Sequence, residues 1–166
     1  QELVEGINYI EMRDGTTLAA MVRFPSFPRD DVPVDGPYPT VVTMSGYDPA
    51  NPYSPPPELQ LADALGYATV GVNVRGKGCS GGALTFFEGA MITDGYDAVE
   101  WAAHLPGSNG AVGMYGFSYP GLVQYLAAAA RPPALKCIAP AMAPWDFHAW
   151  AYEGGALKLH DNLLIA

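Results

Sequence analysis

From residue 40 onward the chain alternates short apolar runs with segments of helical periodicity, and this alternation limits the fold more than any other feature. Strands are predicted over residues 40–44, 67–74, 111–115 and 135–139, and helices over 58–65, 94–104 and about 119–130. Successive parallel strands need right-handed crossovers, which place helices on both faces of the sheet. The sequence therefore predicts an α/β fold with a doubly wound, mostly parallel sheet.

An antiparallel hairpin is predicted before this parallel part, over residues 7–24. The segment Ile7 to Met12 alternates apolar and polar side chains, as a half-buried strand does. Asp14-Gly15 is a tight-turn dipeptide, and Thr17 to Phe24 returns as the second strand.

Composition excludes several classes of protein. The 166 residues carry a net charge of −9 and only eight Lys and Arg, so a broad nucleic-acid-binding face is not expected. No apolar run approaches the ~18 residues of a membrane span. Cys79 and Cys137 are the only cysteines, and the sequence leaves open whether they are free thiols or a bridge.

The chain reads as part of a larger fold. Four parallel strands leave one sheet edge uncovered. Leu157-Lys158-Leu159 and Leu163-Leu164-Ile165-Ala166 leave apolar residues in what is expected to be a helix with no stop signal. A fragment of a nicked enzyme, a subunit of a split enzyme and an incomplete sequence of a longer protein are all compatible with this pattern. The first residue is Gln1 and not Met, which leans toward a processed, exported protein.

Gly116-Phe117-Ser118 sits between a predicted strand and a predicted helix, the context of a nucleophile elbow. The turn is strained, so the residue two before the serine must be small. The usual pattern G-x-S-x-G has glycine two after the serine, where this chain has Pro120 and then Gly121. Proline is tolerated in a first helical turn, so Ser118 remains the predicted nucleophile; the alternative is an ordinary serine in a glycine-rich turn.

Two tyrosines are candidates for binding an oxyanion. The backbone N–H of Tyr119 opens the helix after Ser118, where the helix dipole favours negative charge. Tyr47 follows the strand 40–44 at its carboxyl end, where active-site groups of open α/β sheets gather. An isolated loop tyrosine is more often a packing residue.

Other motifs are weaker. Residues 76–81 match G-x-G-x-x-G, but residues 83–87 do not resemble a helix opening on the third glycine, and the motif lies on the second crossover. We therefore expect a flexible loop beside the active site and no nucleotide cofactor. No cluster has metal-ligand spacing. Acid and base follow the serine in this type of fold, which argues against His104. His148 and His160 follow Ser118, but the acid and base normally lie on later strand ends that this chain does not reach, so neither is the expected base.

Six motifs occur in the order seen in cocaine-esterase-like hydrolases, which belong with the X-Pro dipeptidyl-peptidases, α-amino-acid ester hydrolases and glutaryl acylases. They lie at residues 12–20, 45–47, 66–68, 74–82, 94–97 and 113–121. The chain resembles this family over nearly all of its length. One departure is Asn73, where many relatives have aspartate.

The resemblance implies an α/β-hydrolase domain, an inserted helical cap and a C-terminal jelly-roll domain. It implies that residues 1–144 are the N-terminal half of the hydrolase domain and that 145–166 begin the cap. It implies Ser118 as nucleophile and an oxyanion hole formed by the Tyr47 hydroxyl and the Tyr119 N–H. The acid, the base and the jelly-roll domain are expected outside this chain.

The expected function is hydrolysis of an ester or amide of a small molecule through a serine-linked acyl-enzyme, without a cofactor. A missing C-terminal part or a companion chain would supply the aspartate and histidine. Two alternatives stay open: a peptidase that releases X-Pro dipeptides, and a catalytically inactive hydrolase fold used for binding.

Overall fold

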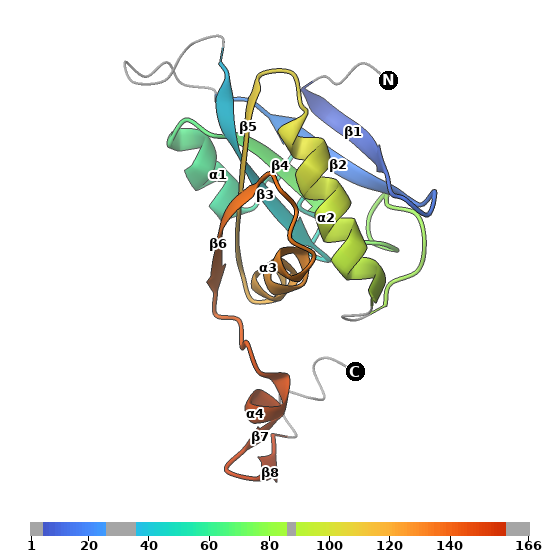
Figure 1. Ribbon diagram of the computed structural model, residues 1–166, viewed down its shortest axis with the longest axis vertical. Helices are drawn as coiled ribbons and strands as arrows, with labels where there is room; N and C mark the ends of the chain where they lie inside the picture. The colour runs from blue at the N-terminus through green and yellow to red at the C-terminus, as the bar shows by residue number, and fades with distance from the viewer. Residues whose placement is uncertain (1–4, 26–35, 86–88, 159–166) are drawn as a thin grey trace.

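The computed structural model describes residues 5–25, 36–85 and 89–158. A six-stranded sheet with the order β1-β2-β4-β3-β5-β6 forms its centre (Figure 1). β1 (Gly6–Glu11) and β2 (Thr17–Arg23) are antiparallel, and β2 is antiparallel to β4 (Ala68–Asn73). β4, β3 (Tyr38–Ser45), β5 (Ser108–Phe117) and β6 (Leu135–Ala141) are parallel. The predicted hairpin and parallel sheet are therefore confirmed.

Helices cover both faces of the sheet. α2 (Gly89–Ala103) and α3 (Tyr119–Ala129) pack on each other and on β5, and α1 (Pro57–Ala64) packs on β4 and β3. Valines of β4 face the α2–α3 core, whereas Gly71 of the same strand faces Leu59 of α1. Because neighbouring strand residues point to opposite faces, α1 lies on the other side of the sheet from α2 and α3.

The core lies mainly between the central strands and the pair α2–α3. Every residue of β4 is buried, as expected for a central strand covered on both faces. β3 and β5 contribute Val42, Met44, Val112 and Met114 to the core.

α1 confirms the helix predicted over residues 58–65. Pro57 opens the helix and Gly66, with φ of 88°, follows its last residues. Leu59 and Ala62 are buried, whereas Leu61 and Leu65 are about half exposed. The sheet contacts the helix along Leu59 and Ala62, which leaves Leu61 and Leu65 on its outer side.

α2 begins earlier than predicted. We expected the helix to begin at Asp94, but it already starts at Gly89 and Asp94 lies in its second turn. The side chain of Asp94 is 1% exposed and pairs with Arg75. An aspartate before an apolar stripe has the same appearance in sequence whether it caps a helix or binds a distant arginine.

After β6 the chain leaves the sheet. α4 (Phe147–Ala151) and the two-residue strands β7 (Tyr152–Glu153) and β8 (Ala156–Leu157) project from one end of the molecule (Figure 1). Leu157, which we expected in a helix, lies instead in β8, paired with Tyr152. The remainder of that predicted helix, residues 159–166, lies outside the described residues.

Candidate active site

A strained turn joins β5 to α3. Ser118 has φ of 60° and ψ of −119°, a conformation that a residue with a side chain rarely adopts and that costs of order 1–3 kcal/mol. The amide of Ser118 donates to Ala141 O of β6 at 2.9 Å, and its carbonyl accepts from Leu122 N at 3.0 Å. These bonds hold the turn from both sides.

Glycines make room for the turn. A Cβ at Gly116 would overlap the Cβ of Pro120, so glycine two before the serine is required, as predicted. A Cβ at Gly121 would lie 2.7 Å from Ala143 Cβ and 3.0 Å from Ala141 O. In the usual pattern, a glycine two residues after the serine makes room for this close approach. Here Gly121, three residues after the serine, makes room for it, and this explains why Pro120 is accommodated.

Gln124 supports the elbow from inside, a role that the sequence did not indicate. Its Nε2 donates to Pro120 O at 3.0 Å, and its Oε1 accepts from Ala139 N of β6 at 2.9 Å. The side chain is buried. A glutamine in an otherwise apolar helix interior was the available signal, because a buried amide needs partners.

The side chain of Ser118 stands at the surface. The residue is exposed and its hydroxyl makes no capping hydrogen bond to α3. α3 begins at the next residue, so its first N–H groups and positive dipole end lie beside Ser118. An exposed serine hydroxyl in this position can attack an electrophile and have the resulting negative charge stabilised.

Tyr119 directs its phenol into the core, and its backbone N–H belongs to the first turn of α3. The ring is 7% exposed, and its hydroxyl donates to Met91 Sδ of α2 at 3.8 Å. Burial, with a smaller contribution from Tyr47, raises the pKa of the Tyr119 phenol to about 12. What Tyr119 offers at the site is therefore its first-turn N–H and not its hydroxyl.

Tyr47 lies beside this turn. Its ring centroid is 5.8 Å from that of Tyr119, and its side chain is 70% exposed. The amide of Tyr47 donates to Ser45 Oγ at 3.0 Å, which curls the chain just beyond the end of β3. The three residues singled out in the sequence, Ser118, Tyr119 and Tyr47, thus come together at the carboxyl ends of β3 and β5.

A charged cluster lies next to this site and was not anticipated. Arg75 binds Asp94 of α2 through two hydrogen bonds of 2.6 and 2.5 Å and Asp14 of the hairpin turn at 2.8 Å. Burial raises the pKa of Asp94, and the guanidinium of Arg75 opposes that shift. The cluster joins three segments that are far apart in sequence, which is why local patterns did not reveal it.

The glycine-rich loop, residues 76–81, folds back on the hairpin. Gly81 N donates to Thr17 O at 2.8 Å, and Ser80 Oγ donates to Asn73 O at 2.7 Å. No helix opens on the third glycine. Its role in the described structure is to pack against Thr17 of β2 and against β4.

Asn73, the departure from the family pattern, is buried at the end of β4. Its Nδ2 donates to Asp48 Oδ1 at 2.6 Å and its Oδ1 accepts from Ala50 N at 3.0 Å. An aspartate at position 73 would lack the donor for Asp48, so the amide fits the loop after Tyr47.

His104 and His148 each contact a neighbouring residue of their own segment. His104 Nδ1 is 2.7 Å from Glu100 O, just after α2 and before β5, at the end of β5 opposite to Ser118. His148 stacks on Tyr152 with ring centroids 5.0 Å apart. His160 lies outside the described residues.

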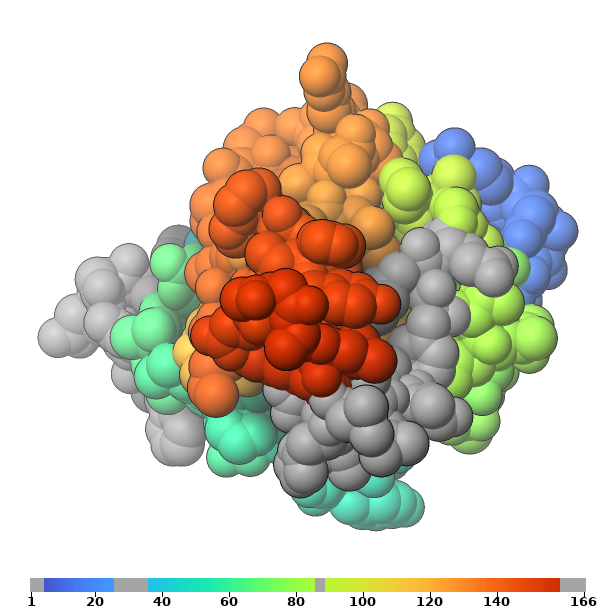
Figure 2. Space-filling view, turned by 90° about the horizontal axis from the view of Figure 1, so that it is seen from below, coloured from blue at the N-terminus to red at the C-terminus, as the bar shows by residue number. Residues whose placement is uncertain are grey.

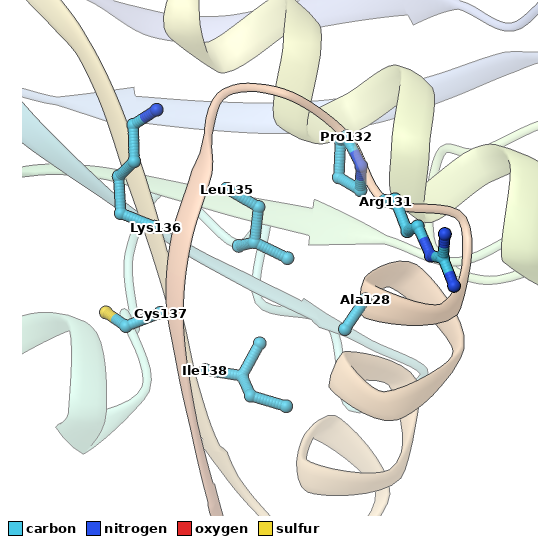
Figure 3. A pocket seen from close by; sticks show the side chains of 7 residues that line it. All are labelled: Ala128, Arg131, Pro132, Leu135, Lys136, Cys137 and Ile138. Atoms are coloured by element: carbon cyan, nitrogen blue, oxygen red, sulfur yellow. The ribbon is translucent and has the colours of Figure 1, made fainter.

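Two cavities occur away from the elbow. One, of about 330 Å³, lies between the end of α3 and the start of β6 and is lined in part by Arg131, Lys136 and Cys137 (Figure 3). The other, of about 270 Å³, lies beside α1 and is lined in part by Arg23 and Asp63. Neither is lined by Ser118.

At the elbow end of the molecule, α4, β7 and β8 project in front of β6 and α3 (Figure 2).

Among residues 5–25, 36–85 and 89–158, no group of three or more His, Cys, Asp and Glu could hold a metal ion. The helices of the same ranges are all too short or too polar to cross a membrane. Cys79 and Cys137 are both exposed free thiols.

Comparison with known proteins identifies the relatives of this chain. The family model described as X-Pro dipeptidyl-peptidase (S15 family) matches residues 14–166. The cocaine esterase of Rhodococcus sp. (strain MB1 Bresler) is 31% identical over 167 residues, which cover 93% of this chain and 26% of that protein.

Solved structures of hydrolases superpose on this chain. A CocE/NonD family hydrolase from Staphylococcus aureus superposes with a TM-score of 0.72 at 28% identity, covering 87% of this chain and 28% of its own. An α-amino acid ester hydrolase has a TM-score of 0.70 at 27% identity, covering 87% of this chain and 26% of its own. The expected α/β-hydrolase fold is confirmed, and the chain corresponds to little more than a quarter of each relative.

Proposed function

Because this chain belongs to the X-Pro dipeptidyl-peptidase (S15) family, we propose that it carries the nucleophile of a serine hydrolase that cleaves an ester or amide of a small molecule. The observation that carries the proposal is the backbone of Ser118: a strained, exposed serine at the start of a helix, with glycines at both close approaches. Strain of this kind persists only where the surrounding structure enforces it.

We propose that Ser118, Tyr47 and Tyr119 act together with a histidine. The Ser118 oxygen attacks the carbonyl carbon and a histidine takes its proton. The carbonyl oxygen becomes negative and is held by the Tyr47 hydroxyl and the Tyr119 N–H. The histidine then gives the proton to the leaving group, and water cleaves the acyl-enzyme by the same steps.

The aspartate and the histidine are proposed to come from outside the described residues. This chain spans about a quarter of the length of the cocaine esterase. Residues 1–144 would then be the nucleophile-bearing half of the hydrolase domain and 145–166 the beginning of a cap. A C-terminal continuation or a companion chain would complete the site.

A second candidate, release of X-Pro dipeptides, is favoured by the description of the family model itself. Ester hydrolysis is favoured by the named activities of the cocaine esterase and the α-amino acid ester hydrolase. Comparing p-nitrophenyl esters with Gly-Pro anilides on the complete enzyme separates the two. Faster turnover of the anilide by a large factor would replace the esterase proposal.

The test of the nucleophile is Ser118→Ala in the complete enzyme. We expect kcat to fall by about 10³-fold or more, because the residual rate then comes from binding and oxyanion stabilisation alone. Ser54→Ala is the matched control, since Ser54 is an exposed serine in a loop and makes no part of the elbow. Activity of Ser118→Ala within about tenfold of the unmodified enzyme would remove Ser118 from this role.

A further inference from the structure

The buried ion pair between Arg75 and Asp94 lies at the junction of two chains of contacts that end at the two tyrosines of the proposed oxyanion hole. Arg75 Nε and Nη2 bind the two carboxylate oxygens of Asp94 at 2.6 and 2.5 Å. The side chains are 12% and 1% exposed. A bidentate pair of this kind fixes both distance and orientation.

One chain of contacts runs from Arg75 to Tyr47. Val74, the residue before Arg75, donates its N–H to Ser45 O at 3.0 Å, and Ser45 Oγ accepts from Tyr47 N at 3.0 Å. A Cβ at Gly46 would lie 3.8 Å from Val74 Cγ2, so the loop that carries Tyr47 rests on this segment. A displacement of Arg75 would therefore displace Val74, against which the loop that carries Tyr47 packs.

The other chain of contacts runs from Asp94 to Tyr119. Met91 is one turn before Asp94 on α2, and its sulfur accepts the Tyr119 hydroxyl at 3.8 Å. A Cβ at Gly95 would lie 2.6 Å from Ala127 Cβ, so α2 and α3 are in close contact directly after Asp94. A shift of α2 would be transmitted to the start of α3 through Met91 and Tyr119, and to the end of α3 through Gly95 and Ala127.

We infer that Arg75 and Asp94 are positioning residues that set the separation between Tyr47 and the Tyr119 amide, and thereby the rate of the oxyanion-forming step. This inference rests on the proposed function of the site. Neither side chain touches the substrate. Their effect is exerted through Tyr47 on one side and through α2 and Tyr119 on the other.

The structure contains a matched control on the same helix. Arg13 and Asp97 also join the hairpin to α2, with Arg13 Nη2 and Asp97 Oδ1 2.6 Å apart. Arg13 is 52% exposed, and neither residue belongs to the contacts that lead to the tyrosines. A pair that only joined the hairpin to α2 would change the stability of the protein and leave kcat per active site unaltered.

The experiment compares Asp94→Asn with Asp97→Asn in the complete enzyme, well below its melting temperature. Active sites are counted by fluorophosphonate titration, so that loss of folded protein does not appear as loss of kcat. We expect Asp94→Asn to lower kcat by about tenfold to a hundredfold, with KM within about twofold, because small misplacements of catalytic groups cost this much. Asp97→Asn is expected to leave kcat within about twofold. Equal effects of the two variants would overturn the inference.

A double-mutant cycle with Tyr47→Phe makes the test specific. If Asp94 acts through the Tyr47 hydroxyl, the kcat penalty of Asp94→Asn shrinks to about threefold or less once that hydroxyl is gone. The same penalty in both backgrounds would mean that the pair acts elsewhere and would overturn the inference while leaving the proposed function intact. If Tyr47→Phe alone leaves kcat unchanged, or Ser118→Ala stays active, the proposed site fails and the inference fails with it.

Arg75→Lys is the second variant, for use if Asp94→Asn does not fold. Lysine keeps the charge but loses the bidentate geometry. We expect a smaller loss of kcat with KM preserved, and the same shrinkage in the Tyr47→Phe background. Unchanged kcat in Arg75→Lys would overturn the positioning role.

Discussion

At the scale of single residues, the elbow depends on the lack of a Cβ at Gly116. The Cβ of an alanine there would overlap that of Pro120. We therefore expect Gly116→Ala to lower the free energy of unfolding by about 1–3 kcal/mol, the usual cost of overpacking, as measured by urea unfolding. Gly89→Ala is the control, because a Cβ at Gly89 meets nothing within 4 Å. A Gly116→Ala variant as stable as Gly89→Ala would contradict the geometry described for the turn.

The second residue-scale prediction concerns the Tyr47 hydroxyl. If it is one of two oxyanion donors, Tyr47→Phe lowers kcat by about 10²–10³-fold with little change in KM, because the donor acts mainly in the transition state. Steady-state kinetics of the complete enzyme measure this. Tyr53→Phe is the matched control, since Tyr53 is 94% exposed and lies in the same connection. A loss of less than about threefold for Tyr47→Phe would argue for a packing role.

Residues that act through local backbone geometry could be predicted from the sequence, and residues that act through distant partners could not. The Gly116-Phe117-Ser118 turn is specified by neighbouring residues, so its pattern identified it. The pairing of Asp94 was not predicted, because its partner, Arg75, is brought to it only by the crossover between β4 and α2. Gln124 was missed for the same reason, because its partner on β6 lies outside its own helix.

At the scale of elements, α2 and α3 pack closely where Gly95 meets Ala127. A Cβ at Gly95 would lie 2.6 Å from that of Ala127, well inside ordinary contact. Gly95→Ala should lower the free energy of unfolding by about 1–3 kcal/mol despite the better helix propensity of alanine. Adding Ala127→Gly should recover part of that loss by restoring space. Denaturant unfolding of the two variants tests this, and a Gly95→Ala variant more stable than the unmodified protein would refute the close approach.

The turn between β1 and β2 is held to the loop after β4 by Asp14 and Arg75, and this contact predicts a pH dependence. The hydrogen bond from Arg75, aided by the Thr16 amide, lowers the pKa of Asp14 to about 2. Because the folded pKa lies below the unfolded one, the contribution of Asp14 to stability is present above pH ~4 and is lost as the pH falls toward 2.

The measurement compares the melting temperatures of the unmodified protein and Asp14→Asn across this range. The unmodified protein should be the more stable at neutral pH, and the difference should shrink as the pH falls below about 4. A difference that stays constant from neutral pH to pH 3 would show that the ion pair does not lower the pKa of Asp14.

Element types were predictable because apolar periodicity and turn residues act locally. The helix 58–65, the hairpin and all four parallel strands were found in this way. The buried face of α1 was not, because Leu61 and Leu65 fit a helical stripe as well as Leu59 and Ala62 do. Only the position of the sheet decides which of the two stripes is buried, and that position is a tertiary property.

At the scale of the whole molecule, His104 is poorly placed to serve Ser118. β5 separates His104 from Ser118 by the length of its 10 residues, roughly 30 Å at ~3.3 Å per residue. We expect His104→Gln and His148→Gln each to leave kcat within about twofold in the complete enzyme. A loss of 10³-fold or more in either variant would identify that histidine as the base and would end the proposal of a base outside the described residues.

The sheet has the uncovered edge that was expected from the strand pattern of the sequence. β6 is an edge strand with several exposed residues, among them Lys136 and Cys137. The cocaine esterase is about four times as long as this chain, because the match covers 26% of it. The strand pattern indicated an uncovered edge, but no residue of this chain specifies what lies beyond it.

The most direct test of the central claim is mass spectrometry of the complete protein after treatment with a fluorophosphonate, which reacts with activated serines. The proposed function predicts one adduct, located by peptide mapping on Ser118 and absent from Ser118→Ala. An adduct on another serine, or no adduct on a folded and complete protein, would contradict the assignment of Ser118 as the nucleophile.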